Sequence, residues 1–271
     1  MDVSVVILNY NTYQLTVNCI NSIIEKTKDV EIEIILVDNA STECPPELFL
    51  KHFPDIILVP NITNLGFSKG NNIGIDLAKA NCVLLINSDT QLINNAIKFT
   101  YDYLMTRKNV GAVTGKIVFP DGSPQSVCQR FPSIRFQLIE LFRIHKFLTK
   151  RKAGRLLLGS FFDYKEDIKA DWIWGTYFMF KKNIISNLPE GKLDDSNFMY
   201  GEDMQWCLDI KNIGYEIHYN KDAEIIHYLG ASKGLANEMI KNNYNIFLNR
   251  NFAAFHKLII KLLSYFLSTS S

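Results

Sequence analysis

The chain has 271 residues, of which 47% are hydrophobic, and its formal net charge is +1. This length suits one large α/β domain with a substantial core, and the near-neutral charge argues against a nucleic-acid partner. The five cysteines have no C-x-x-C spacing, which argues against a disulfide framework and indicates a reduced, intracellular chain. The start lacks the features of a signal peptide, and no apolar segment is long and uncharged enough to span a bilayer. We therefore expect a protein that is cytoplasmic or peripheral to a membrane.

The N-terminal part of the chain alternates short apolar runs with helical patterns. Apolar runs predict strands, and amphipathic spacing between them predicts helices. The expected strands cover residues 3–8, 33–37, 56–59 and 83–86, and the expected helices cover residues 13–26, 46–52 and a segment ending near residue 80. This alternation is typical of βαβ units, a parallel sheet and right-handed crossovers.

Three of these strands end in polar side chains, at Asn9, at Asp38 and at the sequence Asn87-Ser88-Asp89. The carboxyl ends of parallel strands meet at one rim, where open α/β sheets bind ligands. Such a rim suits hydroxyls, a base edge and a divalent cation, and the usual phosphate loops are absent from the sequence. A simpler alternative is that Asp89 or Thr90 caps the next helix, expected from about residue 94.

Glycines recur at positions 66, 70 and 74, at helical spacing. Their spacing is explained equally well by close helix packing and by the approach of a ligand to the backbone.

Four motifs in this order resemble family 2 glycosyltransferases of the GT-A fold. They are Val5-Val6-Ile7-Leu8-Asn9-Tyr10-Asn11, Val37-Asp38-Asn39-Ala40-Ser41, Asn64-Leu65-Gly66-Phe67 with Gly70-Asn71-Asn72, and Asn87-Ser88-Asp89-Thr90. Residues 121–122 and 130–133 are similar to segments of the rhamnosyltransferase-like branch, and the resemblance extends from residue 3 to about residue 251. It implies a mostly parallel central sheet, with a Rossmann-like nucleotide-binding half (about 1–118) and a C-terminal acceptor half (119–250). An amphipathic helix over residues 251–271 is expected to follow.

The resemblance also implies roles for residues of these motifs. Asp38 would hold the uracil or thymine edge, or the ribose. Asp89 would bind Mn²⁺ or Mg²⁺ on the donor diphosphate, and Asn87 stands where many relatives carry an aspartate that often contacts ribose. The remaining positions expected to bind the donor are Asn9, Asn39, Asn64, Gly66, Lys69, Asn71 and Ser88.

The segment around Trp174 and Gly175 precedes an expected strand over residues 177–180. In the family this position lies over the donor sugar and the acceptor, so Trp174, Gly175 and the later Trp206 are expected to contact sugar. The alternative for a tryptophan here is a place in the core.

Glu202 and Asp203 open an apolar helix that is expected to end at Asn212, with Gly214 behind it. Two acids at this place could simply interact with the helix dipole. They match the E-D motif of the family, in which the second acid is the catalytic base, so Asp203 and Glu202 are expected to be catalytic. Relatives often carry arginine where Asp209 stands, which puts a phosphate or acceptor contact from that position in doubt.

His227 begins an H-x-x-G-x-S segment, 227–232, after an expected strand over residues 216–219. A lone histidine is more often structural, but this one is a metal ligand in the family. Together with Asp89 it would suit Mn²⁺ or Mg²⁺ held mainly by substrate phosphates.

Two segments indicate contact with a surface. Residues 133–162 mix large apolar side chains with many lysines and arginines, a pattern that predicts a helix at a membrane surface or a partner, or a solvated helix on the core. One apolar face is expected near the C-terminus, with Lys257 and Lys261 opposite, and it either lies on a membrane or docks on the domain. The residues of this face are Phe252, Phe255, Leu258, Ile259, Leu262, Leu263 and Phe266.

The sequence therefore predicts an inverting, metal-dependent glycosyltransferase that uses a nucleotide-diphosphate sugar. The favoured donor is dTDP-rhamnose, with galactofuranose, mannose or glucose donors as rivals. The expected acceptor is a lipid-linked or cell-surface polysaccharide, met at the inner face of the cytoplasmic membrane. The alternatives are a nucleotidyltransferase or metal-dependent phosphohydrolase, and a catalytically inactive module that binds a nucleotide sugar.

Overall fold

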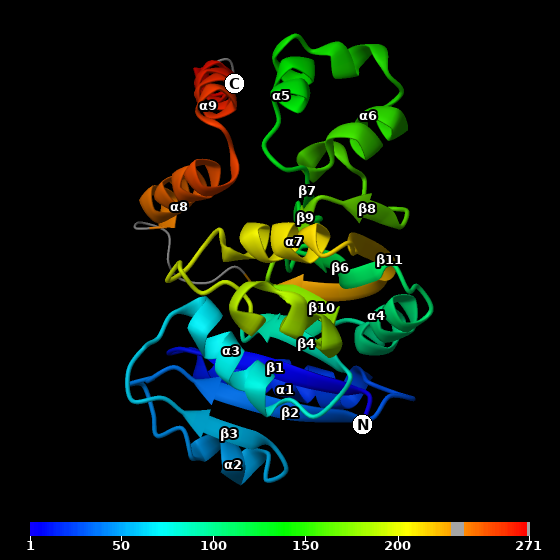
Figure 1. The fold of residues 1–271 in the computed structure, drawn as a ribbon. Coiled ribbons are helices and arrows are strands. Elements are labelled where there is room, and N and C mark those ends of the chain that lie inside the picture. Colours follow the sequence, from blue (N-terminus) through cyan, green and yellow to red (C-terminus); the bar gives the residue numbers. More distant parts are fainter. Residues whose placement is uncertain (229–235, 270–271) are drawn as a thin grey trace.

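The structure is a computed structural model that describes residues 1–228 and 236–269. In this part of the chain one nine-stranded sheet has the order β3-β2-β1-β4-β10-β6-β11-β5, and β8 pairs with β11 (Figure 1). Its strands are β1 (Val3–Asn9), β2 (Ile32–Asp38), β3 (Ile57–Pro60), β4 (Cys82–Asn87), β5 (Thr90–Leu92), β6 (Val110–Val118), β8 (Ile168–Ala170), β10 (Tyr177–Lys181) and β11 (Glu216–His227). The short strands β7 (Cys128–Gln129) and β9 (Trp172–Ile173) form a second sheet. The predicted α/β fold with a mostly parallel sheet is confirmed.

The N-terminal half follows the predicted βαβ pattern. Strands β3, β2, β1 and β4 are parallel neighbours. The apolar runs of β1, β2 and β4 are largely buried on both faces, whereas the edge strand β3 is half-buried. The first three helices of this half are α1 (Tyr13–Lys26), α2 (Leu48–His52) and α3 (Phe67–Leu77). From β1 to β4 the predicted elements agree with the observed ones to within a few residues.

The two halves share the sheet because β10 inserts between β4 and β6 and runs antiparallel to both. Beyond it, β6 pairs in parallel with β11. Strands on both sides of the predicted boundary near residue 118 therefore belong to one continuous sheet. The division into domains remains a prediction.

The segment after Asp89 is a strand and not a helix cap. Thr90 begins β5, which pairs antiparallel with the end of β11, and helix α4 (Ala96–Met105) begins later, after Asn95. The alternative that Asp89 or Thr90 caps a helix is therefore wrong. Pairing with a strand far away in the sequence overrides the local signal for a helix start.

Strand β11 is longer than expected. It continues past Tyr219 through a register shift before Glu224 and ends at His227. Because of this continuation His227 lies beside Thr90, at the same edge as the end of β4.

Helix α7 (Glu202–Asn212) ends as predicted, with Gly214 at a positive φ of 93°. Helix α8 (Ala236–Asn251) was not predicted, and it is followed by α9 (Ala254–Thr269). Among the described residues no helix is long and apolar enough to cross a membrane.

The basic segment 133–162 is not one amphipathic helix. It is divided into α5 (Ile134–Leu141), η1 (Ile144–Phe147), α6 (Lys150–Leu157) and η2 (Gly159–Phe161). Helix α5 has no buried residue and lies beside α9, far from the first strands of the sheet (Figure 1).

The packed side of α9 also differs from the prediction. Ile260 is 1% exposed and lies on the side that meets α5, whereas Phe255, Leu258, Leu262 and Phe266 are exposed. The helix therefore docks on the domain at α5 through the side that carries Ile260, and contact of the predicted apolar face with a membrane or with the domain stays a prediction. The helix has a second apolar side, which the sequence pattern did not separate from the first.

Candidate active site

The polar ends of the parallel strands meet at one rim, as predicted. Asn9 pairs in register with Asp38, and Leu8 pairs with Asn87. The amide of Asn9 donates to Asp38 Oδ2 at 2.7 Å and to Ser41 Oγ at 3.0 Å. Its oxygen accepts from two threonine hydroxyls, Thr12 and Thr16. Because both N–H groups and both lone pairs of the Asn9 amide already have partners, the role of Asn9 at the rim is to orient Asp38.

A second amide cluster shapes the loop before α3. Asn39 Nδ2 donates to Asn64 Oδ1 at 2.7 Å, and Asn39 Oδ1 accepts from the backbone N–H of Leu65. Asn64 Oδ1 also accepts from the N–H of Gly66. Asn39 and Asn64 thus fix the backbone of a loop that lies beside the rim.

Gly66 is the point where this loop meets the second half of the chain. Its φ is 84°, and a Cβ added there would lie 2.4 Å from the carbonyl oxygen of Phe198. The next N–H, of Phe67, donates to that same oxygen at 2.7 Å. Glycine is therefore required for the approach of the loop to the segment that precedes α7.

The other glycines of this motif serve helix packing. A Cβ on Gly70 or Gly74 would contact the side chains of Leu8 and Val6 in β1. In the same helix Asn71 is buried and donates to the carbonyl oxygen of Phe67, while Lys69 is exposed in the first turn. Of these positions, Lys69 is the one whose side chain extends into solvent.

The sequence Asn87-Ser88-Asp89 lies at the end of β4. Asn87 Oδ1 is buried and has no hydrogen-bond partner among the described residues, and Ser88 Oγ lies 2.8 Å from Thr12 Oγ1. A buried amide oxygen without a partner costs free energy unless a ligand supplies a donor. Asn87 is therefore ready to accept a hydrogen bond from a bound molecule.

Asp89 and His227 lie together at the rim. His227 Nε2 is 3.3 Å from Asp89 Oδ1, and both side chains are largely buried. The N–H of Tyr228 donates to the backbone oxygen of Asp89, which ties the end of β11 to this turn. The structure thus brings together the two predicted metal ligands.

Gln125 fixes the ring of His227. Its Nε2 donates to the backbone oxygen of His227 at 2.9 Å, and its Oε1 lies 2.9 Å from His227 Nδ1. An amide oxygen only accepts, so Nδ1 carries the proton and a neutral ring presents the lone pair of Nε2 to Asp89. Two acceptors facing each other repel, unless the ring is protonated or a cation lies between them.

The pair fits a divalent cation. Two ligands about 2.1 Å from Mg²⁺ at a right angle are about 3.0 Å apart, close to the observed separation of Asp89 and His227. No group of three or more His, Cys, Asp or Glu side chains suited to a metal occurs among the described residues. A cation here would therefore take most of its ligands from substrate phosphates and water.

Asp203 lies at the start of α7 and is held by two backbone donors. The N–H of Gly175 donates to Oδ2 at 3.2 Å, and the N–H of Met204 donates to Oδ1 at 2.9 Å. Burial raises the pKa of the Asp203 carboxyl, and these backbone N–H groups oppose that rise. The result is an oriented carboxylate that binds a proton more readily than an ordinary aspartate does.

Glu202 is the more buried of the two acids. Its Oε2 has no hydrogen-bond partner in the described chain, and it is 5% exposed. Burial, followed by the charge of Asp203, raises the pKa of Glu202. Two adjacent carboxyls in a dry setting favour a state with one proton between them.

Two neighbouring residues connect the base to the donor rim. Gly175 donates to Asp203, and the next residue, Thr176, accepts from the backbone N–H of Asn87 at 3.0 Å. One short segment before β10 therefore fixes the position of Asp203 relative to the end of β4.

The three predicted sugar-contacting residues differ in their surroundings. Trp174 is half-buried and Gly175 is buried beside the ring of Phe67. Trp206 is fully buried, stacks on Phe67 and donates to the backbone oxygen of Asp194. The expectation that Trp206 contacts the acceptor is therefore corrected, because its ring belongs to the core beneath the site.

Helix α8 supports the segment before α7. Asn243 donates to the backbone oxygens of Met199 and Tyr200, and Asn251 donates to Gln205 on α7. The polar character of α8 concealed this role in the sequence, because its contacts are hydrogen bonds and not a clear apolar stripe.

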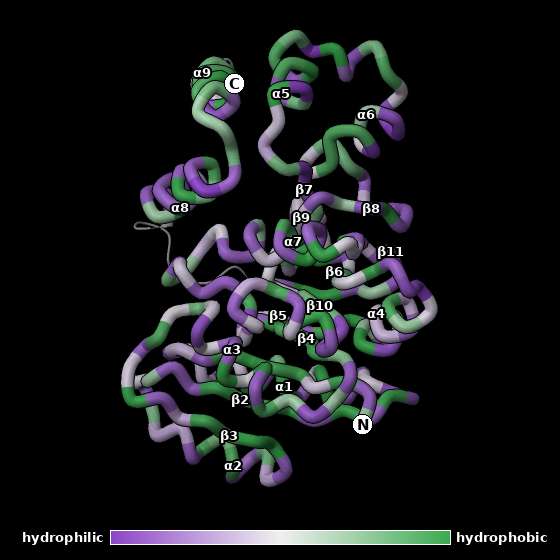
Figure 2. Tube along the Cα trace, in the orientation of Figure 1, coloured by the Kyte–Doolittle hydropathy of each residue, from purple (hydrophilic) through white to green (hydrophobic). Residues whose placement is uncertain are grey.

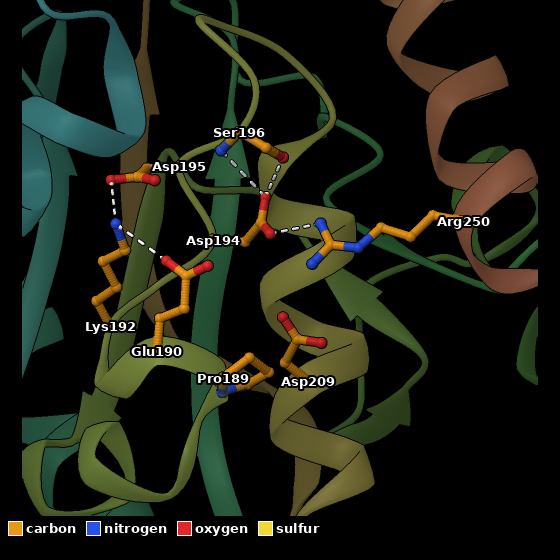
Figure 3. A pocket seen from close by; sticks show the side chains of 8 residues that line it. All are labelled: Pro189, Glu190, Lys192, Asp194, Asp195, Ser196, Asp209 and Arg250. Atoms are coloured by element: carbon orange, nitrogen blue, oxygen red, sulfur yellow. Dashed lines mark hydrogen bonds and ion pairs between the residues drawn. The ribbon is translucent and has the colours of Figure 1, made fainter.

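A charged hollow of about 190 Å³ lies between α7, α8 and the loop before α7 (Figure 3). Arg250 pairs with Asp194 there, and Lys192 pairs with Glu190 and Asp195. Asp209, which accepts from Gln205, lines the same hollow. The charged side chains of the hollow are mostly paired with one another, and these ion pairs stabilise the loop that carries Phe198.

Gln125 and α8 were not found by sequence reasoning. For Gln125 no signal was available, since a glutamine in a loop has no local pattern. The segment 229–235, which includes most of the predicted H-x-x-G-x-S motif, lies outside the described residues.

Known proteins share sequence and fold with this chain. The family model "Glycosyl transferase family 2" matches residues 4–185. The chain is 23% identical over 219 residues to N-acetylglucosaminyl-diphospho-decaprenol L-rhamnosyltransferase of Mycobacterium tuberculosis (strain ATCC 25618 / H37Rv), covering 75% of this chain and 68% of that protein. It is 30% identical over 116 residues to glycosyltransferase GlyG of Streptococcus pneumoniae serotype 4 (strain ATCC BAA-334 / TIGR4), covering 42% of this chain and 38% of that protein.

Solved structures show the same fold. Residues 1–349 of TarS from S. aureus superpose with a TM-score of 0.59 at 15% identity, covering 96% of this chain and 69% of that one. GalNAc-T7 with UDP, GalNAc and Mn²⁺ superposes with a TM-score of 0.65 at 14% identity, covering 92% of this chain and 48% of that one. The fold is the GT-A fold, and the chain is a sugar-transferring member of glycosyl transferase family 2.

Proposed function

We propose that this chain transfers a sugar, with inversion, from a nucleotide-diphosphate donor to a hydroxyl of a lipid-linked or cell-surface glycan, at the inner face of the cytoplasmic membrane. The observation that carries the proposal is the pair of bonds from Gly175 to Asp203 and from Thr176 to Asn87. They hold an oriented carboxylate beside the rim where the donor would lie. This arrangement suits a displacement in which acceptor and leaving group must be in line.

Asp203 is the proposed general base. It takes the proton of the acceptor hydroxyl as that oxygen forms its bond to the anomeric carbon and the bond from this carbon to the diphosphate breaks. The nucleoside diphosphate leaves with the electron pair of the broken bond. The raised pKa of Asp203 serves this role, because a base is most effective when its pKa approaches the working pH.

Asp89 and His227 are the proposed protein ligands of Mn²⁺ or Mg²⁺. Such a cation, when bound with the donor, would offset the charge that grows on the departing diphosphate. Gln125 keeps Nε2 of His227 free for this purpose by holding the proton on Nδ1.

The donor half of the site is proposed to bind the nucleoside. Asp38 would accept from the base or the ribose, and Asn87 Oδ1 would accept from a ribose hydroxyl. The similarity to a rhamnosyltransferase favours dTDP-rhamnose as donor and a diphospholipid-linked sugar as acceptor.

A thermal-shift screen of nucleotide sugars with and without Mn²⁺ tests the proposal. A ligand that binds only the folded state raises the unfolding midpoint by mass action. We expect one donor to stabilise the protein in Mn²⁺ and much less in EDTA. A nucleotide sugar that stabilises the protein equally in both conditions would contradict the metal assignment. Stabilisation by none of them would contradict the function.

A further inference from the structure

The segments at residues 134–157 and helix α9 form a lobe on the far side of α7 from strands β1 to β3 (Figure 1). They are joined by Gln137 of α5, which donates to Ser264 Oγ at 2.7 Å and to the backbone oxygen of Ile260 at 3.3 Å. Parts of the chain more than a hundred residues apart are thus joined in one unit, which we call the basic lobe. It comprises residues 134–157, which include α5, η1 and α6, together with α9.

The basic lobe carries a charge unlike that of the rest of the protein. It contains one acid, Glu140, and nine basic residues, whereas the whole chain has a net charge of only +1. Glu166, just outside the lobe, pairs with two of these cations. The basic residues are Arg135, Arg143, Lys146, Lys150, Arg151, Lys152, Arg155, Lys257 and Lys261.

Large apolar side chains are exposed on the same lobe. Phe147 is 89% exposed and Phe142 is 66% exposed, on either side of a turn at Arg143. On α9 an exposed apolar stripe recurs at i, i+3, i+7 and i+11, on the side away from Ile260, and Figure 2 shows α9 as a mainly hydrophobic helix. This outer stripe consists of Phe255, Leu258, Leu262 and Phe266.

A hollow of about 290 Å³ lies between the turn at Arg143 and the α5-facing side of α9. It is lined by Arg143 and Lys146 from the turn and η1, by Leu267 from the end of α9, and by Glu140, Leu141, His145 and Phe161. Exposed apolar side chains bordered by cations are typical of helices that lie in the plane of a lipid interface.

Charge decides which partner this surface fits. A second copy of the lobe would bring two strongly positive surfaces together, which is unfavourable. An anionic bilayer attracts the cations and takes up the phenylalanine and leucine side chains between its headgroups. We propose that the basic lobe, through residues 142–148 and the outer stripe of α9, docks on the surface of an anionic phospholipid membrane.

This inference deepens the proposed function, because a membrane-docked lobe would hold the enzyme where a lipid-linked acceptor is found. Docking itself requires no donor, acceptor or turnover. The two proposals can therefore fail separately.

The test is flotation of the full chain with vesicles of phosphatidylcholine alone and with vesicles that contain phosphatidylglycerol. We expect strong partition only into the anionic vesicles, weakened by salt. Each basic residue near an anionic surface contributes about fivefold to the partition, so Arg143→Gln with Lys146→Gln should lower it about 25-fold. Phe142→Ser with Phe147→Ser, and separately Leu258→Ser with Leu262→Ser, should each lower it by about tenfold or more.

Matched controls remove exposed side chains of the same kinds elsewhere. Lys51→Gln with Lys108→Gln removes two exposed cations, and Ile24→Ser with Leu77→Ser removes two exposed apolar groups outside the lobe. These variants should float like the original protein. The unfolding midpoint of every variant, measured without vesicles, shows that the protein is folded.

Equal partition into neutral and anionic vesicles would overturn the proposal, as would lobe variants that float like the controls. A change of oligomeric state in the lobe variants, without a change in flotation, would identify an interface between proteins and also overturn it. A protein that docks but binds no nucleotide sugar would contradict the proposed function alone.

Discussion

His227 Nε2 lies 3.3 Å from Asp89 Oδ1, although the two residues are 138 positions apart in the sequence. This contact exists because β11 continues through its register shift and pairs with β5. Asp89→Asn and His227→Ala should each weaken donor binding in Mn²⁺ far more than in EDTA. Titration calorimetry with the donor measures both affinities. Equal donor affinity with and without metal in the unmodified protein would make the assignment wrong.

Gln125 should also affect metal binding, although it is not itself a proposed metal ligand. Gln125→Leu removes the acceptor that holds the proton on His227 Nδ1, and loss of such a partner typically weakens metal binding about 10–100-fold. Gln125→Glu keeps an acceptor at that position and should have a smaller effect. Mn²⁺ affinity measured in the presence of nucleoside diphosphate separates this role from a general loss of stability. If both variants bind Mn²⁺ as well as the original protein does, Gln125 has no part in the site.

Asp203→Asn should reduce kcat about 10²–10⁴-fold while donor Kd changes little, because a general base acts only as the new bond forms. The amide still has an oxygen that can accept from Gly175 or Met204, so the start of α7 should keep its conformation. Glu202→Gln is the control and should be milder. Near-full kcat in Asp203→Asn, with both substrates saturating, would place the base elsewhere.

The pH dependence of kcat/KM should follow from the raised pKa of Asp203. The base must be unprotonated, so activity is present above this pKa and is lost as the pH falls through it. The acid limb of the pH profile should therefore have its midpoint at a pH above about 3.9, which is the ordinary pKa of aspartate. In Asp203→Asn the residual rate should lack this limb. A limb at the ordinary aspartate value would show that burial does not raise the pKa.

Gly66→Ala should destabilise the protein strongly. A Cβ there would lie 2.4 Å from the carbonyl oxygen of Phe198, in addition to the cost of the positive φ. Backbone strain costs about 1–3 kcal/mol and overpacking about another 1–3 kcal/mol in the free energy of unfolding. Gly122→Ala is the matched control, because Gly122 has the same φ of 84° but no atom within 4 Å of its added Cβ. Urea unfolding of both variants should show the larger loss for Gly66→Ala, and equal losses would mean that the loop moves aside.

The parts of the fold that local pattern controls were predictable. Apolar runs ending at Asn9, Asp38 and Asn87 give parallel strands, and the geometry of a parallel sheet then brings their ends together. The strand at Thr90 was missed because its pairing with β11 is long-range and its local sequence resembles a helix start. Helix α8 and Gln125 were missed because both act through hydrogen bonds to distant backbone atoms, which leave no periodic pattern in the sequence.

Trp206 illustrates the opposite error. Aromatic residues next to an acidic motif are often associated with sugar binding, yet this ring is enclosed by Phe67 and Phe178. Its indole N–H is bonded to the backbone of Asp194, so its polar atom also faces inward. Spacing along a helix distinguishes one side from the other, but only the packing shows which side is covered.

The bonds from Gly175 and Thr176 are made by backbone atoms, and this has a consequence for how such an enzyme can diverge. Backbone donors and acceptors are unchanged when side chains are exchanged, so the alignment of Asp203 with the end of β4 does not depend on the identity of the neighbouring residues. Side chains of the loop before α7 and of α8 can therefore vary without disturbing that alignment. Descendants of one ancestral sequence could acquire new acceptors by changing this region, while the reacting atoms continue to meet in the same way.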